Sequence, residues 1–402
     1  MQFESNVIAG DLVADRLGLL LGESPIAAAE RERTAFDRLA HPFSERIVLF
    51  GAGGLGRRTL ANLRRIGLEP LAFADNNSAL WETSVDGIPV YSTARAATVY
   101  GRDAVFVVTI WGTQARDRMV DRIRQLLDLG CKHVAPAGLL FWKFPEVFLP
   151  YFPLDLPHKA LHSTREIKAA FDLFKDESSR REYVAQVAFR LFLDSDELTC
   201  SPESKQYFPS ELIHLGEHEV LVDCGAFDGD SIADFIDRQG HAFGSIVAFE
   251  PDAANRNNLD ARLSQYPASI GDRIHIFPQA VSSRTGHVSF SSTGTDQSRI
   301  GDSGNLVECV TLDDALQTLR PSLIKFDIEG AELDALAGAC NVISHSRPVL
   351  AVSAYHEQDH LWRIPLALAQ LCKDYKFFLR PHGSEGWDLT CYAVPSERVK
   401  LF

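Results

Sequence analysis

The sequence predicts an α/β protein with two doubly wound parallel sheets joined by a helical segment. Strand-like and helix-like segments alternate in two separate blocks, which is typical of parallel strands connected by helices. Each block opens with an apolar strand that runs directly into a glycine-rich turn. Prolines and a long helical pattern separate the blocks. The expected domains are 1–45, a helical segment; 46–140, the first sheet; 141–215, a helical linker; and 216–402, the second sheet.

Length and charge narrow the class of protein. A chain of 402 residues is too long for one hydrophobic core. The formal net charge of −14 argues against a nucleic-acid partner, which requires a clustered positive surface. Seven cysteines without a CxxC pair favour reduced thiols. The first residues lack a basic region, and their longest apolar run is too short to span a bilayer. We therefore expect a cytoplasmic protein without a membrane span, and we keep a homodimer as one assembly to test.

The positions of prolines and apolar residues predict the secondary-structure elements. The linker carries prolines at 145–157 and then a helical pattern over 163–194 with apolar positions on one face. The second block ends in a turn-rich stretch, 375–395, that predicts an antiparallel hairpin. The other expected strands are 46–50, 68–75, 88–90, 103–110 and 131–136 in the first block, and 219–224, 245–250, 273–278, 322–327 and 348–356 in the second.

The first glycine turn, GAGGLG, follows the strand RIVLF and precedes a helix. Gly51, Gly53 and Gly56, with Asp75 at the end of the next strand, match a Rossmann-like dinucleotide fingerprint, which predicts bound NAD or another nucleotide. In the alternative interpretation the glycines only permit tight strand–helix packing and Asp75 caps the turn after it. This block also resembles the amino-terminal Rossmann-like domains of nucleotide-sugar acyltransferases.

The second glycine turn, DCGAFDGD, carries three aspartates at the tip of a buried strand. Asp223, Gly225 and Gly229 repeat the acid and glycine spacing of a nucleotide-binding turn, and Glu250 ends the next strand. So many carboxylates repel phosphate but suit a positively charged ligand. A cationic nucleoside with ribose hydroxyls for Glu250 indicates S-adenosylmethionine. The alternative is that the aspartates merely cap a turn and a helix.

The second block resembles the FkbM family of S-adenosylmethionine-dependent methyltransferases. The likeness rests on EVLVDCGAFDGD, IVAFEPD, PQAVSS, LDDAL, LIKFDIEGAEL and VSAYHEQDHLW, in that order. It implies a class I methyltransferase sheet with a terminal antiparallel hairpin. Phe227 departs from the family, which often has asparagine there. The cofactor-binding residues that the resemblance implies are Asp223, Gly225, Ala226, Gly229, Glu250, Asp252, Gln279 and Ala280.

Candidate catalytic residues follow the last two parallel strands. Lys325 and Asp327 are two apart and so share one face of a strand, as catalytic groups or as members of a buried ion pair. His356 ends the next strand, where a pKa near neutrality would suit a general base. With Asp327 and Glu329, His356 could also bind Mg²⁺ or Mn²⁺. No arrangement for a covalent nucleophile is apparent.

These residues predict an S-adenosylmethionine-dependent O-methyltransferase. The resemblance implies that the acceptor is a hydroxyl of a saccharide or a nucleotide-sugar-type molecule. One alternative is an NAD-dependent oxidoreductase that uses the GAGGLG turn. The other is a non-catalytic nucleotide-sugar binding protein.

Overall fold

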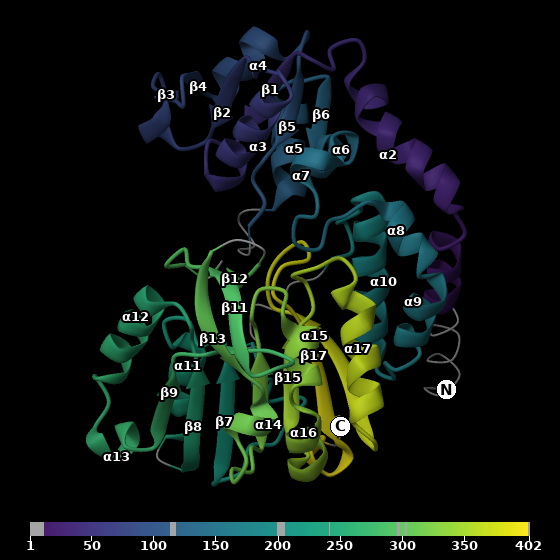
Figure 1. Cartoon of the computed structure of the whole chain (residues 1–402). Coiled ribbons are helices and arrows are strands. Elements are labelled where there is room, and N and C mark those ends of the chain that lie inside the picture. Colours follow the sequence, from purple (N-terminus) through teal and green to yellow (C-terminus); the bar gives the residue numbers. More distant parts are fainter. Residues whose placement is uncertain are drawn as a thin grey trace.

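The chain forms two α/β domains, with helices of the linker running alongside both of them (Figure 1). Residues 1–11 of the expected helical segment lie outside the described residues, whereas residues 12–20 are helical and α2 (Pro25–Ala40) follows them. Ser24 caps α2 by accepting a hydrogen bond from the backbone of Ala27. The structure is a computed structural model that describes residues 12–112, 118–198, 206–240, 242–295, 298–301 and 304–400.

The first domain contains a six-stranded sheet with the order β3-β4-β2-β1-β5-β6. All its pairings are parallel except that of β3 with β4, a short hairpin that the sequence pattern did not predict. Helices α3 (Gly54–Arg65), α4 (Thr93–Tyr100) and α5 (Met119–Asp128) connect the strands. The strands are β1 (Ile47–Phe50), β2 (Ala72–Asp75), β3 (Ser84–Val85), β4 (Ile88–Ser92), β5 (Val105–Val108) and β6 (His133–Pro136).

The linker differs from the expected single helix over 163–194. The helix breaks at 172–176, and Asp176 starts the second part by accepting a hydrogen bond from the backbone of Ser179 at 3.1 Å. The second part is buried on more than one face, because Val184 and Val187 join the core of the second domain while Phe189 joins that of the first. The linker helices are α6 (Ala137–Lys143), α7 (Pro145–Phe148), α8 (Pro157–His162), α9 (Thr164–Phe171) and α10 (Glu177–Phe192).

The second domain contains a seven-stranded sheet with the order β16-β17-β15-β14-β7-β8-β9. Five parallel strands and an antiparallel terminal hairpin confirm the predicted methyltransferase-type architecture. The strands are β7 (Glu219–Cys224), β8 (Phe243–Phe249), β9 (Ile274–Phe277), β14 (Leu323–Phe326), β15 (Val349–Ser353), β16 (Tyr375–Pro381) and β17 (Leu389–Pro395). The helices are α11 (Asp230–Gln239), α12 (Ala253–Leu263), α13 (Ala268–Gly271), α14 (Leu312–Ala315), α15 (Glu332–Ala337), α16 (Cys340–Ser346) and α17 (His360–Leu371).

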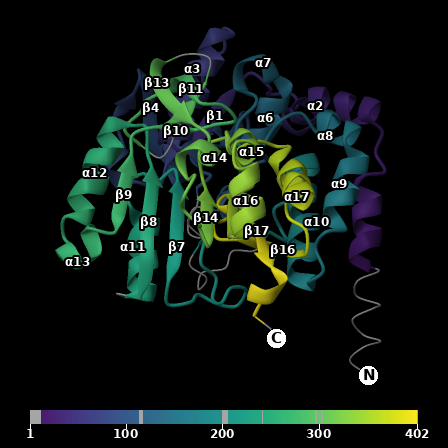
Figure 2. The same cartoon turned by 60° about the horizontal axis from the view of Figure 1, so that its bottom comes forward.

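A second, smaller sheet lies between β9 and β14 in the sequence, and the strand pattern did not predict it. Its order is β10-β13-β11-β12, and it lies on the side of the second domain that faces the first (Figure 2). Only β10 and β13 pair in parallel. The strands are β10 (Ala280–Val281), β11 (Gly286–Ser291), β12 (Arg299–Ile300) and β13 (Asn305–Val310).

Buried contacts join the two domains. Glu385, in the turn of the terminal hairpin, accepts hydrogen bonds from the backbone N–H groups of Met119 at 2.5 Å and Val120 at 3.1 Å. It thereby caps the amino terminus of α5 in the other domain. The rings of Trp111 and Trp387 lie 4.9 Å apart across the same contact. Among the described residues, none of the helices has the length and apolar character needed to cross a membrane.

Candidate functional site

A cavity of about 300 Å³ opens above the carboxyl ends of β7, β8 and β14. Ligands of open α/β sheets bind at this edge. The small sheet and residues 206–207 complete its wall. Its charged and amide-bearing lining residues are Gln206, Asp230, Glu250, Asn255, Gln279, Lys325, Asp327, Glu329 and Asp388.

The turn after β7 holds three residues in the left-handed region. Gly225 has φ +88° and Gly229 has φ +84°. A Cβ on Gly225 would lie 1.9 Å from the carbonyl oxygen of Asp327, and one on Gly229 would lie 2.6 Å from Leu259. Both glycines are thus required by packing within the protein. Phe227, at φ +47°, is strained for a bulky side chain, and such strain is concentrated at functional sites.

The three aspartates of this turn have different roles. Asp223 is fully buried and does not line the cavity; it forms an ion pair with Lys325 at 2.8 Å and accepts a hydrogen bond from Ser231. Asp228 forms an ion pair with Arg262. Only Asp230 lines the cavity. The expectation that the acids gather around a ligand therefore holds for one of them, because the other two are neutralised within the protein.

Lys325 is a member of a buried ion pair, which is one of the two roles that the sequence left open for it. Its ammonium group also donates to the carbonyl of Gly225 at 2.7 Å. Burial lowers the pKa of Lys325, but the carboxylates of Asp223 and Asp327 outweigh this effect and raise it above its usual value. Lys325 is therefore a fixed positive charge that holds the tips of β7 and β14 together.

Glu250 follows β8 and is held by two backbone groups. One carboxylate oxygen accepts from the N–H of Phe227 at 2.9 Å, and the other accepts from the N–H of Asp252 at 2.8 Å. Burial raises the pKa of Glu250, although these two bonds oppose the change. The carboxylate lines the cavity in a fixed orientation, and each of its oxygens has a further lone pair for a ligand hydroxyl.

The remaining predicted cofactor residues divide into two groups. Asp252 does not line the cavity; its side chain caps α12 through Ala254 and accepts from the hydroxyl of Ser298 at 2.8 Å. Ala226 is buried and likewise does not line the cavity. Gln279 and Ala280 do line it, and the buried side-chain oxygen of Gln279 has no hydrogen-bond partner. An amide acceptor is thus available to a ligand.

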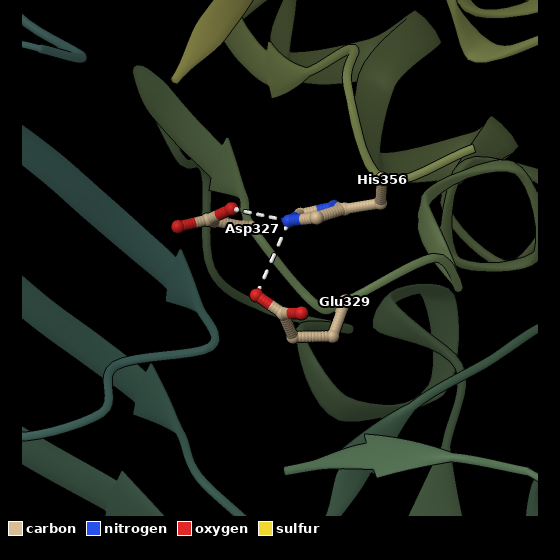
Figure 3. A group of neighbouring side chains, drawn as sticks. All are labelled: Asp327, Glu329 and His356. Atoms are coloured by element: carbon tan, nitrogen blue, oxygen red, sulfur yellow. Dashed lines mark ion pairs between the residues drawn. The ribbon is translucent and has the colours of Figure 1, made fainter. Parts of the chain in front are cut away.

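Asp327, Glu329 and His356, called here the His356 cluster, lie close together (Figure 3). Asp327 and Glu329 line the cavity, whereas His356 does not. Nε2 of His356 lies 3.4 Å from Asp327 and 3.2 Å from Glu329. One ligand atom from each residue lies within 4.8 Å of the others. Nε2 of His356 and Oδ1 of Asp327 are buried without a hydrogen-bond partner. The other oxygen of Asp327 accepts from the hydroxyl of Tyr207 at 2.7 Å.

Glu332, which the sequence did not predict as a site residue, contacts the His356 cluster through Nδ1 of His356. It is fully buried and lies 2.8 Å from Nδ1 of His356 and 3.4 Å from Nδ1 of His360. Its carboxylate also accepts from the N–H groups of Ile328 and Gly330. Burial raises the pKa of Glu332, but His356 and these bonds outweigh it and lower the pKa to about 2.

The protonation of His356 differs from the expected pKa near neutrality. Burial lowers the pKa of the imidazole, but the carboxylates of Glu332 and Glu329 outweigh burial and raise it well above its usual value. The imidazole is therefore protonated near neutral pH and is not a free base. Burial raises the pKa of Glu329, which has a positive φ of +55°. Strained backbone is concentrated at functional sites, so the conformation of Glu329 supports a functional role for the cluster.

The glycine turn of the first domain is explained largely by packing. A Cβ on Gly56 would lie 1.9 Å from the carbonyl oxygen of Gly51, and Gly51 itself has φ +115°. One oxygen of Asp75 accepts from the N–H of Ala52 and the other from the N–H of Asn77, each at 2.7 Å. Gly53 and Gly54 face open space instead, since a Cβ on either would meet no atom within 4 Å.

Comparison with known proteins assigns residues 223–379 to the methyltransferase FkbM domain. The chain also resembles the crystal structure of methyltransferase FkbM from Methylobacillus flagellatus KT, with 25% sequence identity and a TM-score of 0.74. That alignment covers 96% of this chain and 99% of the other, so the likeness extends over both domains. Residues 223–379 therefore form a methyltransferase FkbM domain. A methyltransferase domain of this family implies the use of S-adenosylmethionine.

A second likeness is local. The redox-sensing transcriptional repressor Rex from two strains of Porphyromonas gingivalis is 39% identical over 71 residues, which are 17% of this chain. The chain spans about a third of the length of these curated relatives, 33%. The FkbM domain, in contrast, contains Glu250, Gln279 and the whole His356 cluster. Both halves of the candidate site thus lie within the assigned domain.

Proposed function

We propose that the chain is an S-adenosylmethionine-dependent O-methyltransferase that acts on a hydroxyl of a saccharide or nucleotide-sugar acceptor. The observation that carries this proposal is the position of the His356 cluster, since Asp327 and Glu329 line the cavity proposed for the cofactor. A hydroxyl bound at the cluster lies beside the methyl donor. Methyl transfer then requires in-line alignment over about 3 Å in a site from which water is excluded.

The cofactor is proposed to bind above β7, β8 and β9. Glu250 accepts the ribose hydroxyl groups, and Gln279 with Ala280 contacts the adenine. Asp230 is the carboxylate of the turn that remains to face the positive end of the cofactor. Cys224 takes no part as a nucleophile, because it is fully buried and burial raises the pKa of its thiol well above the usual value.

The His356 cluster is proposed to hold Mg²⁺ or Mn²⁺. Carboxylate and neutral imidazole groups suit these ions, so binding would displace the proton that His356 carries near neutral pH. Nε2 of His356 and Oδ1 of Asp327 form no hydrogen bond with the described residues, and their ion pairs lie within the cluster itself. Three carboxylates, counting Glu332, surround one imidazole, so the cluster carries an excess of buried negative charge that a divalent cation would neutralise. Such an ion would supply Lewis acidity, which favours loss of the proton from a hydroxyl. Glu332 would orient the imidazole through Nδ1.

The site leads us to propose a small-molecule or saccharide partner. From the net charge of −14 and the free cysteines we propose a cytoplasmic location without a nucleic-acid partner. A homodimer remains the assembly to test by sedimentation. The packing of Gly51, Gly56 and Asp75 leaves the NAD-dependent oxidoreductase with less support than methyl transfer.

The test uses methyl-labelled S-adenosylmethionine, a panel of saccharides and nucleotide sugars, and either EDTA or added Mg²⁺ or Mn²⁺. We expect label in a sugar product only with the metal. His356→Ala should lower turnover by about 10²-fold and weaken Mn²⁺ binding measured by electron paramagnetic resonance, with nearly unchanged cofactor affinity. His345→Ala, an exposed histidine on α16, is the matched control.

Other outcomes would support a different mechanism or a different function. Full activity in EDTA that still depends on His356 would make the imidazole a metal-free base. Cofactor binding without label transfer to any sugar would favour the non-catalytic binding protein, and reduction of NAD by a panel member would favour the oxidoreductase.

A further inference from the structure

A second cavity, of about 730 Å³, lies between the two domains. The first domain contributes the start of α3, the linker contributes residues 150–152, and the second domain contributes the small sheet and the loops after β14 and β15. Glu329 and Ile300 line both this cavity and the proposed cofactor cavity. The interdomain cavity therefore adjoins the place where the methyl group would be transferred.

Phe152 marks the catalytic end of the interdomain cavity. Its ring centroid lies 6.5 Å from that of His356 and packs edge-on against Trp387 at 4.7 Å. Its φ of +49° is an outlier for a bulky residue, and the surrounding contacts must maintain this strain. An aromatic ring held in this way beside the cluster can form one wall for a bound acceptor.

Two arginines line the same cavity. The guanidinium group of Arg58, on α3, lies 4.9 Å from the ring centroid of Tyr151, within the range of a cation–π contact. Arg299 lies on β12 of the second domain. Among the described residues, neither arginine is within 4.0 Å of a carboxylate oxygen, in a chain with 54 acidic and 40 basic residues. Neither charge is thus held in a direct ion pair within the described residues, although Arg299 acts on Glu357 and opposes the rise that burial causes in the pKa of that carboxyl group.

Backbone N–H groups at the start of α3 add partial positive charge on the same helix as Arg58. The first turn of α3 has no side-chain cap at Gly53, and a Cβ on Gly53 or Gly54 would meet no atom within 4 Å. Unpaired N–H groups at a helix amino terminus favour an anion. The carboxyl groups of Glu329 and Glu357 line the same cavity. Glu329 belongs to the His356 cluster, and Glu357 interacts electrostatically with both His356 and Arg299. The cavity therefore favours a ligand with an anionic end near α3 and a neutral, hydroxyl-bearing end near His356.

We propose that the acceptor binds between the domains with a phosphoryl group held by Arg58 and Arg299. Guanidinium groups bind phosphoryl oxygens through paired, charge-assisted hydrogen bonds. A sugar attached to that group would extend past Phe152 and place a hydroxyl at the His356 cluster. The inference rests on the proposed methyl transfer, and it adds that the amino-terminal domain selects phosphorylated acceptors.

Calorimetry with the full chain tests this inference. The chain is saturated with S-adenosylhomocysteine in excess EDTA, and inorganic pyrophosphate, UDP-glucose or glucose is added. We expect pyrophosphate and UDP-glucose to bind at least about tenfold more tightly than glucose. Arg58→Ala and Arg299→Ala should each weaken the two charged ligands by about tenfold, roughly 1.4 kcal/mol. Arg65→Ala, an exposed arginine on the same helix, should leave their affinities unchanged.

Several results would overturn the inference. These are equal affinities for charged and neutral ligands, or charged-ligand affinities that neither arginine variant changes. UDP-glucose that binds more tightly than pyrophosphate would indicate a nucleotide sugar, whereas equal affinity would indicate recognition of the phosphoryl group alone. Arg58→Lys, which keeps the charge, should retain part of the affinity if Arg58→Ala disturbs folding. Affinity for S-adenosylmethionine is measured in parallel: its absence from the parent would refute the proposed function, whereas its presence without any arginine dependence would refute only this inference.

Discussion

Replacing Glu332 by glutamine should destabilise the second domain while leaving its shape nearly unchanged. The pKa of Glu332 is lowered from 4.5 to about 2, a change of roughly 2.5 pH units. At about 1.36 kcal/mol per unit, this corresponds to about 3 kcal/mol of preference for the ionised side chain in the folded protein. Glu332→Gln removes that charge beside His356 and His360. We therefore expect the free energy of unfolding to fall by about 3 kcal/mol.

The pH dependence of this effect has a defined sign. Because the folded-state pKa of Glu332 is lowered, its contribution is present above 4.5 and disappears as the pH falls toward about 2. Because the folded-state pKa of His356 is raised, its contribution is complete below 6.5 and disappears as the pH rises through the raised value. The difference in the free energy of unfolding between parent and variant should thus be largest between pH 4.5 and pH 6.5.

Urea unfolding followed by circular dichroism, in excess EDTA and over pH 4 to 9, measures this difference. Glu166→Gln, an exposed glutamate on α9, serves as the control and should change the free energy of unfolding by less than about 0.5 kcal/mol. An equally small change for Glu332→Gln, or a difference that does not vary with pH, would refute the electrostatic reasoning for the cluster. Mn²⁺ affinity should also fall by about 10- to 100-fold in the variant.

Two further predictions concern the first domain and its contact with the second. Asp75→Ala should leave the affinity for S-adenosylmethionine unchanged, because its carboxylate bonds to the backbone of Ala52 and Asn77 within the first domain; a tenfold loss by calorimetry would mean one composite cofactor site. Glu385→Ala should cost about 1 kcal/mol in urea unfolding and speed amide hydrogen exchange at the start of α5, because it removes an interdomain helix cap. Unchanged exchange there would show that the Glu385 cap does not stabilise the start of α5.

The sequence allowed much of the fold to be predicted because strand length and helix spacing are local properties. The parallel strands and the terminal hairpin follow from apolar runs and turn residues. The small sheet was missed because β10 and β12 are only two residues long, too short for a period-2 pattern. β11 and β13 are six residues long but each has only one buried residue, so neither has a long apolar run. The break before α10 was missed because residues 172–176 contain neither proline nor glycine.

The candidate site was predictable where residues follow a strand and less so where tertiary contacts decide. Glu250, Asp327 and His356 were found because each follows a parallel strand. Asp223 was assigned to the ligand because its pairing with Lys325 depends on the register of β7 and β14, in which the two residues lie side by side. Tyr207 and Glu332 were missed because they reach the cluster from the segment before β7 and from the first residue of α15.

The most direct test of the central claim, that the cavity above β7 and β8 binds S-adenosylmethionine, is the affinity of the full chain for this cofactor before and after Glu250→Ala. Calorimetry should show binding by the parent and a loss of at least about tenfold, or 1.4 kcal/mol, in the variant. Glu217→Ala, an exposed glutamate before β7, should bind like the parent. Unchanged affinity in a folded Glu250→Ala protein would contradict the account, because it would place the cofactor elsewhere.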